Sequence, residues 1–123
     1  TIEEMNFKDG LPIYIQIAER LSDEILAGHY VADMRVPGIR EYAALLEVNV
    51  NTAVKAFDQL ASCGILYNKR GLGYFVANEA KTLILETRRK NFFENDVPEF
   101  FKQIRLLAIT PEELEKIFDQ YLP

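Results

Sequence analysis

Residues 37–76 contain the pattern that most restricts what this chain can fold into. Within it, Ile39, Ala43 and Leu46 fall on one face of a helix at amphipathic spacing. After a break at residues 47–48, a second apolar face with the same spacing follows: Ala53, Ala56, Phe57 and Leu60. Asn49 begins this second helix and is suited to cap it by accepting a hydrogen bond from a first-turn backbone N–H. Two short helices joined by a tight turn predict a helix-turn-helix.

Beyond Gly64, which should end the second of these helices, the spacing changes to that of β-strands. The runs ILY (65–67) and YFV (74–76) flank the glycine-rich sequence KRGLG at 69–73. A β-hairpin that follows a helix-turn-helix is the wing of a winged helix, and this fold usually binds duplex DNA. As a GxG sequence, the hairpin tip is a poor nucleotide-binding motif because no strand-to-helix unit surrounds it.

An amphipathic helix is also predicted before this core, from Pro12 to Gly28. Its apolar residues repeat every fourth position: Ile13, Ile17, Leu21 and Ile25. We expect the opposite face, with Glu19, Arg20, Asp23 and Glu24, to be solvated. Residues 1–10 are predicted to be irregular, with Phe7 as a possible anchor, and residues 29–36 to form a linker that could contribute one short strand.

The C-terminal third is helical by its pattern and rich in phenylalanine. Its apolar residues step by four and three positions, which is typical of a helix that packs on another helix: Phe93, Val97, Phe100, Ile104 and Leu107. About 45 residues are too few to bury such a stripe alone. We therefore expect it to pair two copies of the chain into a homodimer with two-fold symmetry.

Two prolines mark helix boundaries in this tail. Pro98 should either kink one helix or follow the start of a new one after Asp96, with Glu99 completing a capping box. Thr110 and Glu113 bracket Pro111 and predict a second capping box at the start of the last helix. The predicted fold class is mainly α: a winged helix-turn-helix of three helices plus a β-hairpin wing (residues 1–78), followed by a short α-helical dimerisation region (79–123).

Composition excludes several functional classes and leaves DNA binding open. The chain has 123 residues, a net charge of −5 and no apolar run long enough to cross a membrane. The acidic first ten residues do not resemble a signal peptide, so a cytoplasmic location is expected. His29 and Cys63 are the only residues of their types. Neither has the neighbours of a catalytic or metal site. A redox-sensing role is open to Cys63, but we expect it to be a buried, inert thiol. No enzyme activity or cofactor is expected.

The predicted DNA-binding residues lie on the helix-turn-helix and the wing. Asn51 and Thr52 have short polar groups suited to base edges, while Lys55, one turn further, suits a phosphate. Alternatively, such residues only cap the helix or remain solvated, and Asn49 could do no more than cap. Arg40 could reach a phosphate or form an ion pair with Glu41 or Asp33.

The wing tip supplies two cations, Lys69 and Arg70, beside Gly71 and Gly73. The glycines allow positive φ and let the backbone approach a phosphate. From residue 49 to 76 the only acid is Asp58. Local charge is therefore positive although the whole chain is acidic. Since this basic surface is small, a dimer would be needed so that two such surfaces bind DNA together.

The sequence from Leu11 to residue 78 resembles the N-terminal domain of the GntR family of bacterial transcription regulators. The short tail and the VNVNT segment at 48–52 resemble its YtrA-like subfamily, which has a small two-helix C-terminal region. The resemblance implies DNA contacts by Arg40, by Asn49, Asn51 and Thr52, by Lys55, and by the wing tip with Lys69, Arg70, Gly71 and Gly73. Two departures are Gly38 in place of serine and Glu47 in place of the turn glycine.

We therefore expect a sequence-specific DNA-binding regulator that represses transcription as a homodimer on a two-fold operator. Its recognition helix, residues 49–63, would enter the major groove, and its wing, residues 68–74, would lie on the adjacent backbone or minor groove. The alternative is a winged-helix module that binds another protein through its phenylalanine-rich tail and does not bind DNA. A small-molecule effector is possible, but nothing in the tail identifies one.

Overall fold

The computed structural model of the protein describes residues 10–122, so the possible anchor Phe7 lies outside the described residues. Contacts divide the chain into two compact units between Leu85 and Glu86. The functional division proposed at residue 78 stays a prediction. In the part of the chain that the structure describes, no helix is long and apolar enough to cross a membrane.

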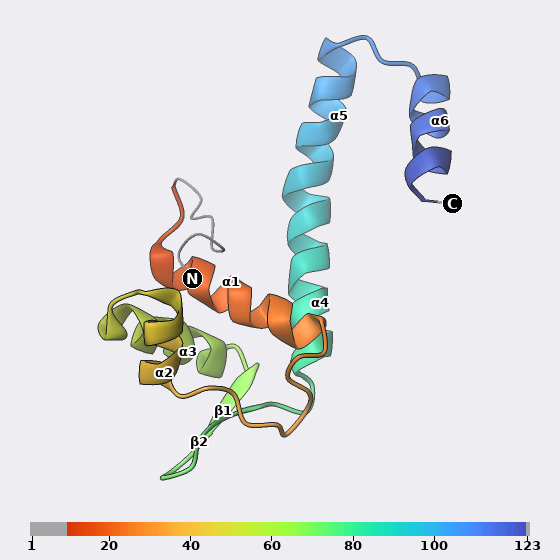
Figure 1. Cartoon of the computed structure of the whole chain (residues 1–123). Coiled ribbons are helices and arrows are strands. Elements are labelled where there is room, and N and C mark those ends of the chain that lie inside the picture. The colour runs from red at the N-terminus through yellow and green to blue at the C-terminus, as the bar shows by residue number, and fades with distance from the viewer. Residues whose placement is uncertain (1–9, 123) are drawn as a thin grey trace. The chain divides into compact units, whose positions relative to one another are not determined.

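The first unit is a winged helix, as predicted. It contains α1 (Ile13–Leu26), α2 (Ile39–Leu46), α3 (Val50–Ser62), β1 (Leu66–Lys69), β2 (Gly73–Val76) and the beginning of α4 (Ala80–Asn91). The three helices gather into one cluster, from which the hairpin projects (Figure 1). The strands are antiparallel, with Leu66 opposite Val76 and Lys69 opposite Gly73.

Phe57 lies at the centre of the core between the helices and the hairpin. Its side chain is fully buried, and its ring centre lies 5.9 Å from that of Tyr42 and 5.2 Å from that of Tyr74. Ala53 and Ala56 of the same helix are also fully buried, which fits the close helix approach expected of a helix-turn-helix. The core therefore fixes α3 on one side and leaves its other face exposed.

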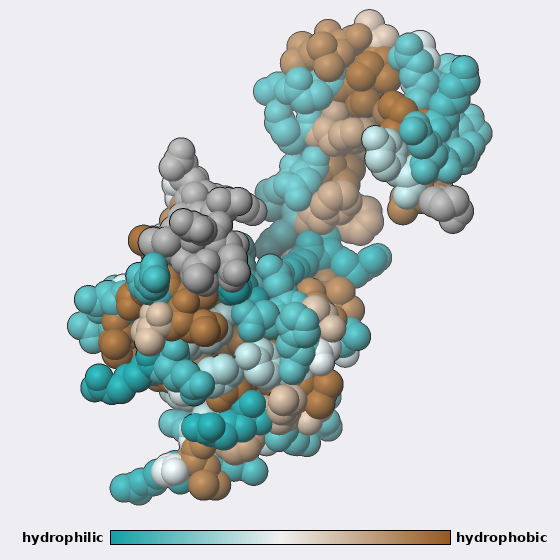
Figure 2. Space-filling view, viewed as in Figure 1, coloured by the Kyte–Doolittle hydropathy of each residue, from teal (hydrophilic) through white to brown (hydrophobic). Residues whose placement is uncertain are grey.

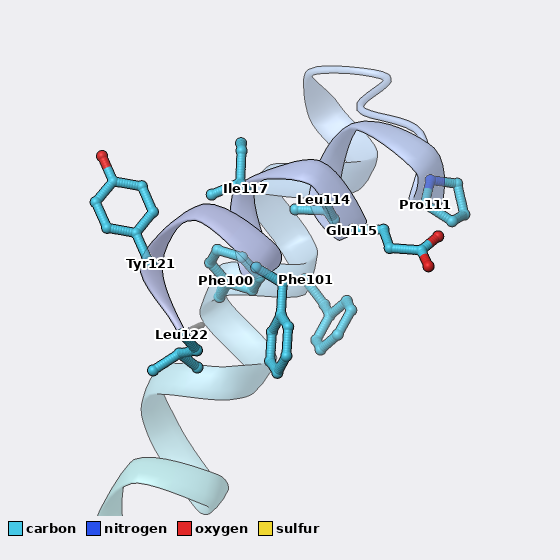
Figure 3. Close-up of a pocket in the computed structure, with 9 residues that line it drawn as sticks. Phe100, Phe101, Pro111, Leu114, Glu115, Ile117, Tyr121 and Leu122 are labelled. Atoms are coloured by element: carbon cyan, nitrogen blue, oxygen red, sulfur yellow. The ribbon is translucent and has the colours of Figure 1, made fainter.

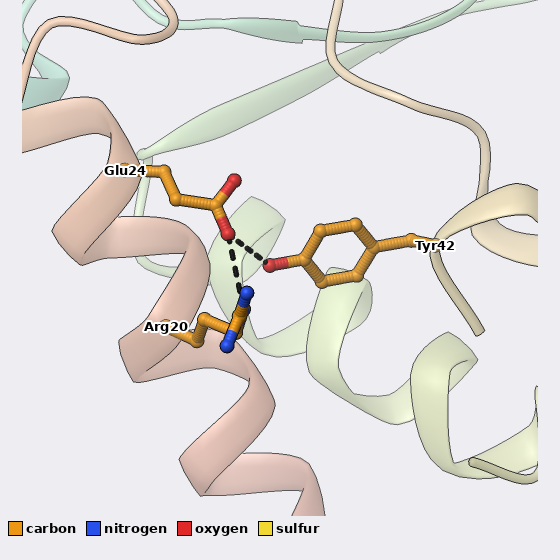
Figure 4. A network of polar contacts seen from close by, with 3 residues as sticks. All are labelled: Arg20, Glu24 and Tyr42. Atoms are coloured by element: carbon orange, nitrogen blue, oxygen red, sulfur yellow. Dashed lines mark hydrogen bonds and ion pairs between the residues drawn. The ribbon is translucent and has the colours of Figure 1, made fainter. Parts of the chain in front are cut away.

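A polar network joins α1 to α2 behind the core (Figure 4). The Tyr42 ring is fully buried, and its hydroxyl donates a hydrogen bond of 2.8 Å to Glu24 Oε1, which also lies 3.3 Å from Arg20 Nε. Burial, followed by the hydrogen bond to Glu24, raises the pKa of Tyr42, so the hydroxyl remains a donor. The prediction of a simply solvated outer face on α1 was thus wrong for Arg20 and Glu24, because a tyrosine of α2 reaches across to them.

The linker before α2 runs beside β2, but it forms a single bridge there rather than the short strand that it could have contributed. Asp33 N–H donates to the Val76 carbonyl at 2.8 Å, and Val36 N–H donates to the Tyr74 carbonyl at 3.0 Å. Between these bonds, Arg35 forms a single antiparallel bridge with Phe75. The wing thus has three strand-like segments rather than two at its base.

The second unit consists of helical segments. A π-helix (Phe92–Asp96) follows α4, and α5 (Val97–Leu106) and α6 (Pro111–Tyr121) complete the chain. Asp96 has helical φ and ψ angles and no capping side-chain bond, so the predicted capping box of Asp96 and Glu99 was wrong. In a regular α-helix, Pro98 would lack an N–H donor and would clash with the carbonyl four residues earlier. The wider π turn that precedes it relieves this clash. The capping box of Thr110 and Glu113 is confirmed.

No residue of the second unit within 86–122 is buried. Hydrophobic side chains, brown in Figure 2, are gathered on its surface between hydrophilic ones. Those most exposed are Tyr121 at 74%, Leu106 at 68% and Leu107 at 66%. The unit therefore presents an apolar surface that no residue within 10–122 buries.

Candidate nucleic-acid interface

The turn between α2 and α3 is closed by a residue in the left-handed region. Glu47 has φ 56° and ψ 44°, and the N–H groups of Glu47 and Val48 donate to the carbonyls of Ala44 and Ala43. A non-glycine residue in this conformation costs about 1 kcal/mol. The turn is thus closed without the glycine that the family resemblance implies at this position.

The N-terminus of α3 is capped as predicted. The Asn49 side chain accepts a hydrogen bond of 2.7 Å from the Asn51 backbone N–H. This bond engages Asn49 Oδ1, while the side chain of Asn51 is exposed and has no polar partner among residues 10–122. Thr52 is half-buried. Of these three side chains, Asn51 is thus the one that is both exposed and without a polar partner in the described residues.

Lys55 lies one turn further along α3 and is exposed, but its ammonium group has an aromatic neighbour. Its Nζ atom lies 5.9 Å from the ring centre of Tyr14 in α1. A ring at this distance attracts a cation weakly and does not neutralise its charge. Tyr14 thus lies beside the Lys55 ammonium group, a contact that the sequence analysis did not identify.

Arg40 is exposed in the first turn of α2. It forms no ion pair with Glu41 or Asp33, nor with any other residue that the structure describes. The alternative reading of Arg40 as one half of a surface ion pair therefore finds no support. Its guanidinium is available to an external anion.

The wing tip needs both of its glycines. Gly71 has φ 79° and Gly73 has φ 107°, values that L side chains rarely adopt. Lys69 pairs with Gly73 across the hairpin, and its ammonium group lies 4.7 Å from the ring centre of Phe75. Arg70, at the tip, is exposed and has no polar partner in the described part of the chain.

One basic residue beside the wing was missed by the sequence analysis. Arg35 Nε donates a hydrogen bond of 2.8 Å to the Leu72 carbonyl at the wing tip. No local motif indicates this contact, since the two residues lie 37 positions apart. The only signal was its position in the linker that was expected to form a short strand.

Cys63 is exposed, so the prediction of a buried thiol was wrong. It follows the last buried residue of α3, Leu60, and is the C-terminal cap of the helix. Gly64, with φ 79°, then ends the helix. Gln59 Nε2 donates a weak hydrogen bond of 3.6 Å to Cys63 Sγ. No cluster of metal-ligating residues occurs within 10–122.

In the second unit, the predicted dimerisation residues are exposed or half-exposed. Val97 and Ile104 are half-buried, whereas the three other members of the stripe are exposed: Phe93, Phe100 and Leu107. An apolar groove of about 520 Å³ lies between α5 and α6 (Figure 3). Phe100 and Phe101 of α5 line it, together with Ile117 of α6 and Leu122, which follows α6.

A winged helix with an exposed, polar and basic recognition face defines a class of DNA-binding proteins. Residues 13–76 match the family described as "Bacterial regulatory proteins, gntR family". The chain belongs to this GntR family and is a DNA-binding transcriptional regulator rather than an enzyme.

Two Bacillus subtilis regulators are similar to the chain. The uncharacterised regulator YhcF is 29% identical over 88% of both chains. The transcriptional repressor YtrA is 33% identical over 64% of this chain and 61% of its own length. These relatives agree with the resemblance to the YtrA-like subfamily.

Solved structures support the same assignment. A putative GntR-family regulator from Bacteroides thetaiotaomicron superposes with a TM-score of 0.77 and 41% identity, over 90% of this chain and 96% of the other. The DNA-binding domain of AraR, in complex with operator ORX1, superposes with a TM-score of 0.54 and 34% identity, over 58% of this chain and 93% of that domain.

Proposed function

We propose that this protein represses transcription by binding a two-fold operator as a homodimer. Each copy would place residues 49–63 in a major groove and residues 68–74 on the adjacent backbone or minor groove. The observation that carries the proposal is that Arg40, Asn51 and Arg70, on successive parts of a winged helix, are exposed without a polar partner in the described residues. The AraR domain bound to its operator and the repressor YtrA support it.

The proposed contacts divide into two kinds. Asn51, assisted by Thr52, reads base edges, because an asparagine amide can pair with adenine through two hydrogen bonds. The remaining contacts hold the backbone and set the register. They come from the cations Arg40, Lys55, Lys69 and Arg70 and from the wing backbone at Gly71 and Gly73. Asn49 contributes by capping α3 and so fixing its N-terminus against the groove.

Dimerisation supplies the affinity that one copy lacks. The four cations proposed to contact phosphates on one winged helix give a small electrostatic footprint, and a second copy doubles the number of phosphate contacts. The second unit offers the apolar surface for this pairing, because no residue of its stripe is buried by the described part of the chain: Phe93, Val97, Phe100, Ile104 and Leu107. A two-fold dimer would then impose a two-fold operator.

The test begins with selection of bound sequences from a random duplex pool, followed by titration of the selected operator. Arg40→Ala should weaken binding to all sequences and reduce the salt slope by about 1. Asn51→Ala should cost about 1–3 kcal/mol and relax the preference at one base pair. Lys81→Ala, which removes an exposed cation of α4, is the matched control and should leave affinity unchanged. If neither Arg40→Ala nor Asn51→Ala changes affinity, the proposed interface is wrong.

Repression, as opposed to activation, and the two-fold symmetry of the operator need separate measurements. With the selected operator overlapping a reporter promoter, expression of the protein should lower reporter output, and higher output would identify an activator instead. The selected sequences should contain two inverted half-sites. Recovery of a single half-site as the complete site would contradict binding as a two-fold dimer.

A further inference from the structure

We propose that Arg35 is a DNA-contacting residue of the wing, which holds the wing tip with one nitrogen and binds a phosphate with the others. This inference rests on the proposed function. It adds a third cation to the two that the wing hairpin itself supplies, Lys69 and Arg70. It also gives the linker before α2 a part in DNA binding.

The backbone places Arg35 beside the wing. The Val76 N–H donates to the Met34 carbonyl at 2.9 Å, and the Val36 N–H donates to the Tyr74 carbonyl at 3.0 Å. These bonds fix Arg35 opposite Phe75 in an antiparallel bridge. Residues opposite each other in such a bridge direct their side chains to the same face. Arg35 thus shares a face with Phe75, over which the Lys69 ammonium group lies.

The guanidinium fits the tip because Gly73 has no side chain. A Cβ atom at Gly73 would lie 3.1 Å from Arg35 Nε and 3.5 Å from Arg35 Nη2. The space left by the glycine is occupied by the guanidinium, whose Nε donates to the Leu72 carbonyl at 2.8 Å. Gly73 therefore serves two purposes, positive φ in the turn and room for this arginine.

The contact should restrain a part of the molecule that has few other restraints. A two-stranded hairpin is only marginally stable by itself in water, and the wing tip is exposed on all three residues of its turn, 70–72. A hydrogen bond to a charged donor at the Leu72 carbonyl reduces the freedom that the tip would otherwise lose on binding DNA. The wing is thus partly ordered before it meets its ligand.

The charge of Arg35 is not neutralised by this arrangement. Its partner is a neutral carbonyl, and Arg35 forms no ion pair with any residue that the structure describes. The nearby acid, Asp33, accepts a hydrogen bond of 2.8 Å from the Tyr67 hydroxyl. A guanidinium has five N–H donors, so four on the two Nη atoms remain for an external acceptor. A phosphate is the acceptor that such a fork fits best.

The test measures operator affinity against salt concentration for the wild-type dimer, Arg35→Ala, Arg35→Lys and the control Lys81→Ala. Arg35→Ala should weaken binding roughly 5- to 20-fold and lower the slope of log K against log salt by about 1. Arg35→Lys keeps the charge, so its slope should match the wild type while part of the affinity is lost. Lys81→Ala should match the wild type in both. An unchanged slope in Arg35→Ala would overturn the phosphate contact.

Hydrogen exchange tests the restraint on the wing independently of DNA. The Leu72 N–H donates to the Lys69 carbonyl at 2.8 Å inside the turn. In Arg35→Ala without DNA, this amide should exchange several-fold faster, while amides of α3 keep their rates and so report an intact fold. Unchanged exchange at Leu72 would overturn the restraining role. Absence of salt-dependent operator binding in the wild type would instead refute the proposed function.

Discussion

The two compact units of this chain use their apolar residues in opposite ways. In the first unit, Ile17, Tyr42 and Phe57 are fully buried around one core. In the second, the five phenylalanines are between 47% and 60% exposed: Phe92, Phe93, Phe100, Phe101 and Phe118. The first unit has enough internal burial to fold on its own contacts, whereas the second gains little from folding until another surface covers it.

The largest change in stability is expected from a substitution at the centre of the core of the first unit. Phe57→Ala should lower the free energy of unfolding by about 3–5 kcal/mol, because it removes a buried ring and leaves a cavity between α2, α3 and the hairpin. Urea unfolding of the full chain measures this. Phe118→Ala, in the second unit, is the size-matched control and should leave the unfolding of the winged helix unchanged. A loss below about 1 kcal/mol for Phe57→Ala would contradict the assigned core.

The second largest effect is expected on dimerisation, from a substitution on the exposed apolar surface of the second unit. Phe100→Glu should convert a dimer to monomers, with a dissociation constant at least about 100-fold higher, since a buried charge at an apolar interface costs several kcal/mol. Sedimentation at several protein concentrations measures this. Lys102→Glu, at an exposed position of the same helix, is the control. The midpoint of thermal unfolding of the winged helix should not fall in Phe100→Glu. A dimer that resists this change must use another surface.

The sequence was sufficient to predict those structural elements that one hydrophobic period or one local motif determines. The three-helix pattern, the hairpin, the Asn49 cap and the capping box at Thr110 all follow from residues close together in the chain. Their physical basis is local: helical spacing, orphan N–H groups and the conformational freedom of glycine. The family followed from the same local motifs.

The sequence was insufficient where a side chain meets a partner far along the chain. Tyr42 reaches Glu24, and Arg35 reaches the Leu72 carbonyl, and neither pair leaves a periodic signal. Near Pro98 the sequence left a kinked helix and a new helix open, and it did not predict the π-helix that precedes the proline. The sequence thus predicted most residues of the candidate site. It did not predict Arg35 or Tyr14, because their place beside the site depends on tertiary contacts.

The smallest effect concerns the cost of the turn that precedes the recognition helix. Glu47 holds a left-handed conformation, so Glu47→Gly should raise the free energy of unfolding by up to about 1 kcal/mol. Glu41→Gly is the matched control: it is exposed in the first turn of α2, where glycine should destabilise by about 1 kcal/mol or less. Opposite signs for two changes of the same residue type would locate strain at the turn itself. A loss of stability in Glu47→Gly would mean that the carboxylate contributes more than the strain costs, and the winged helix would then be less strained than its φ angle indicates.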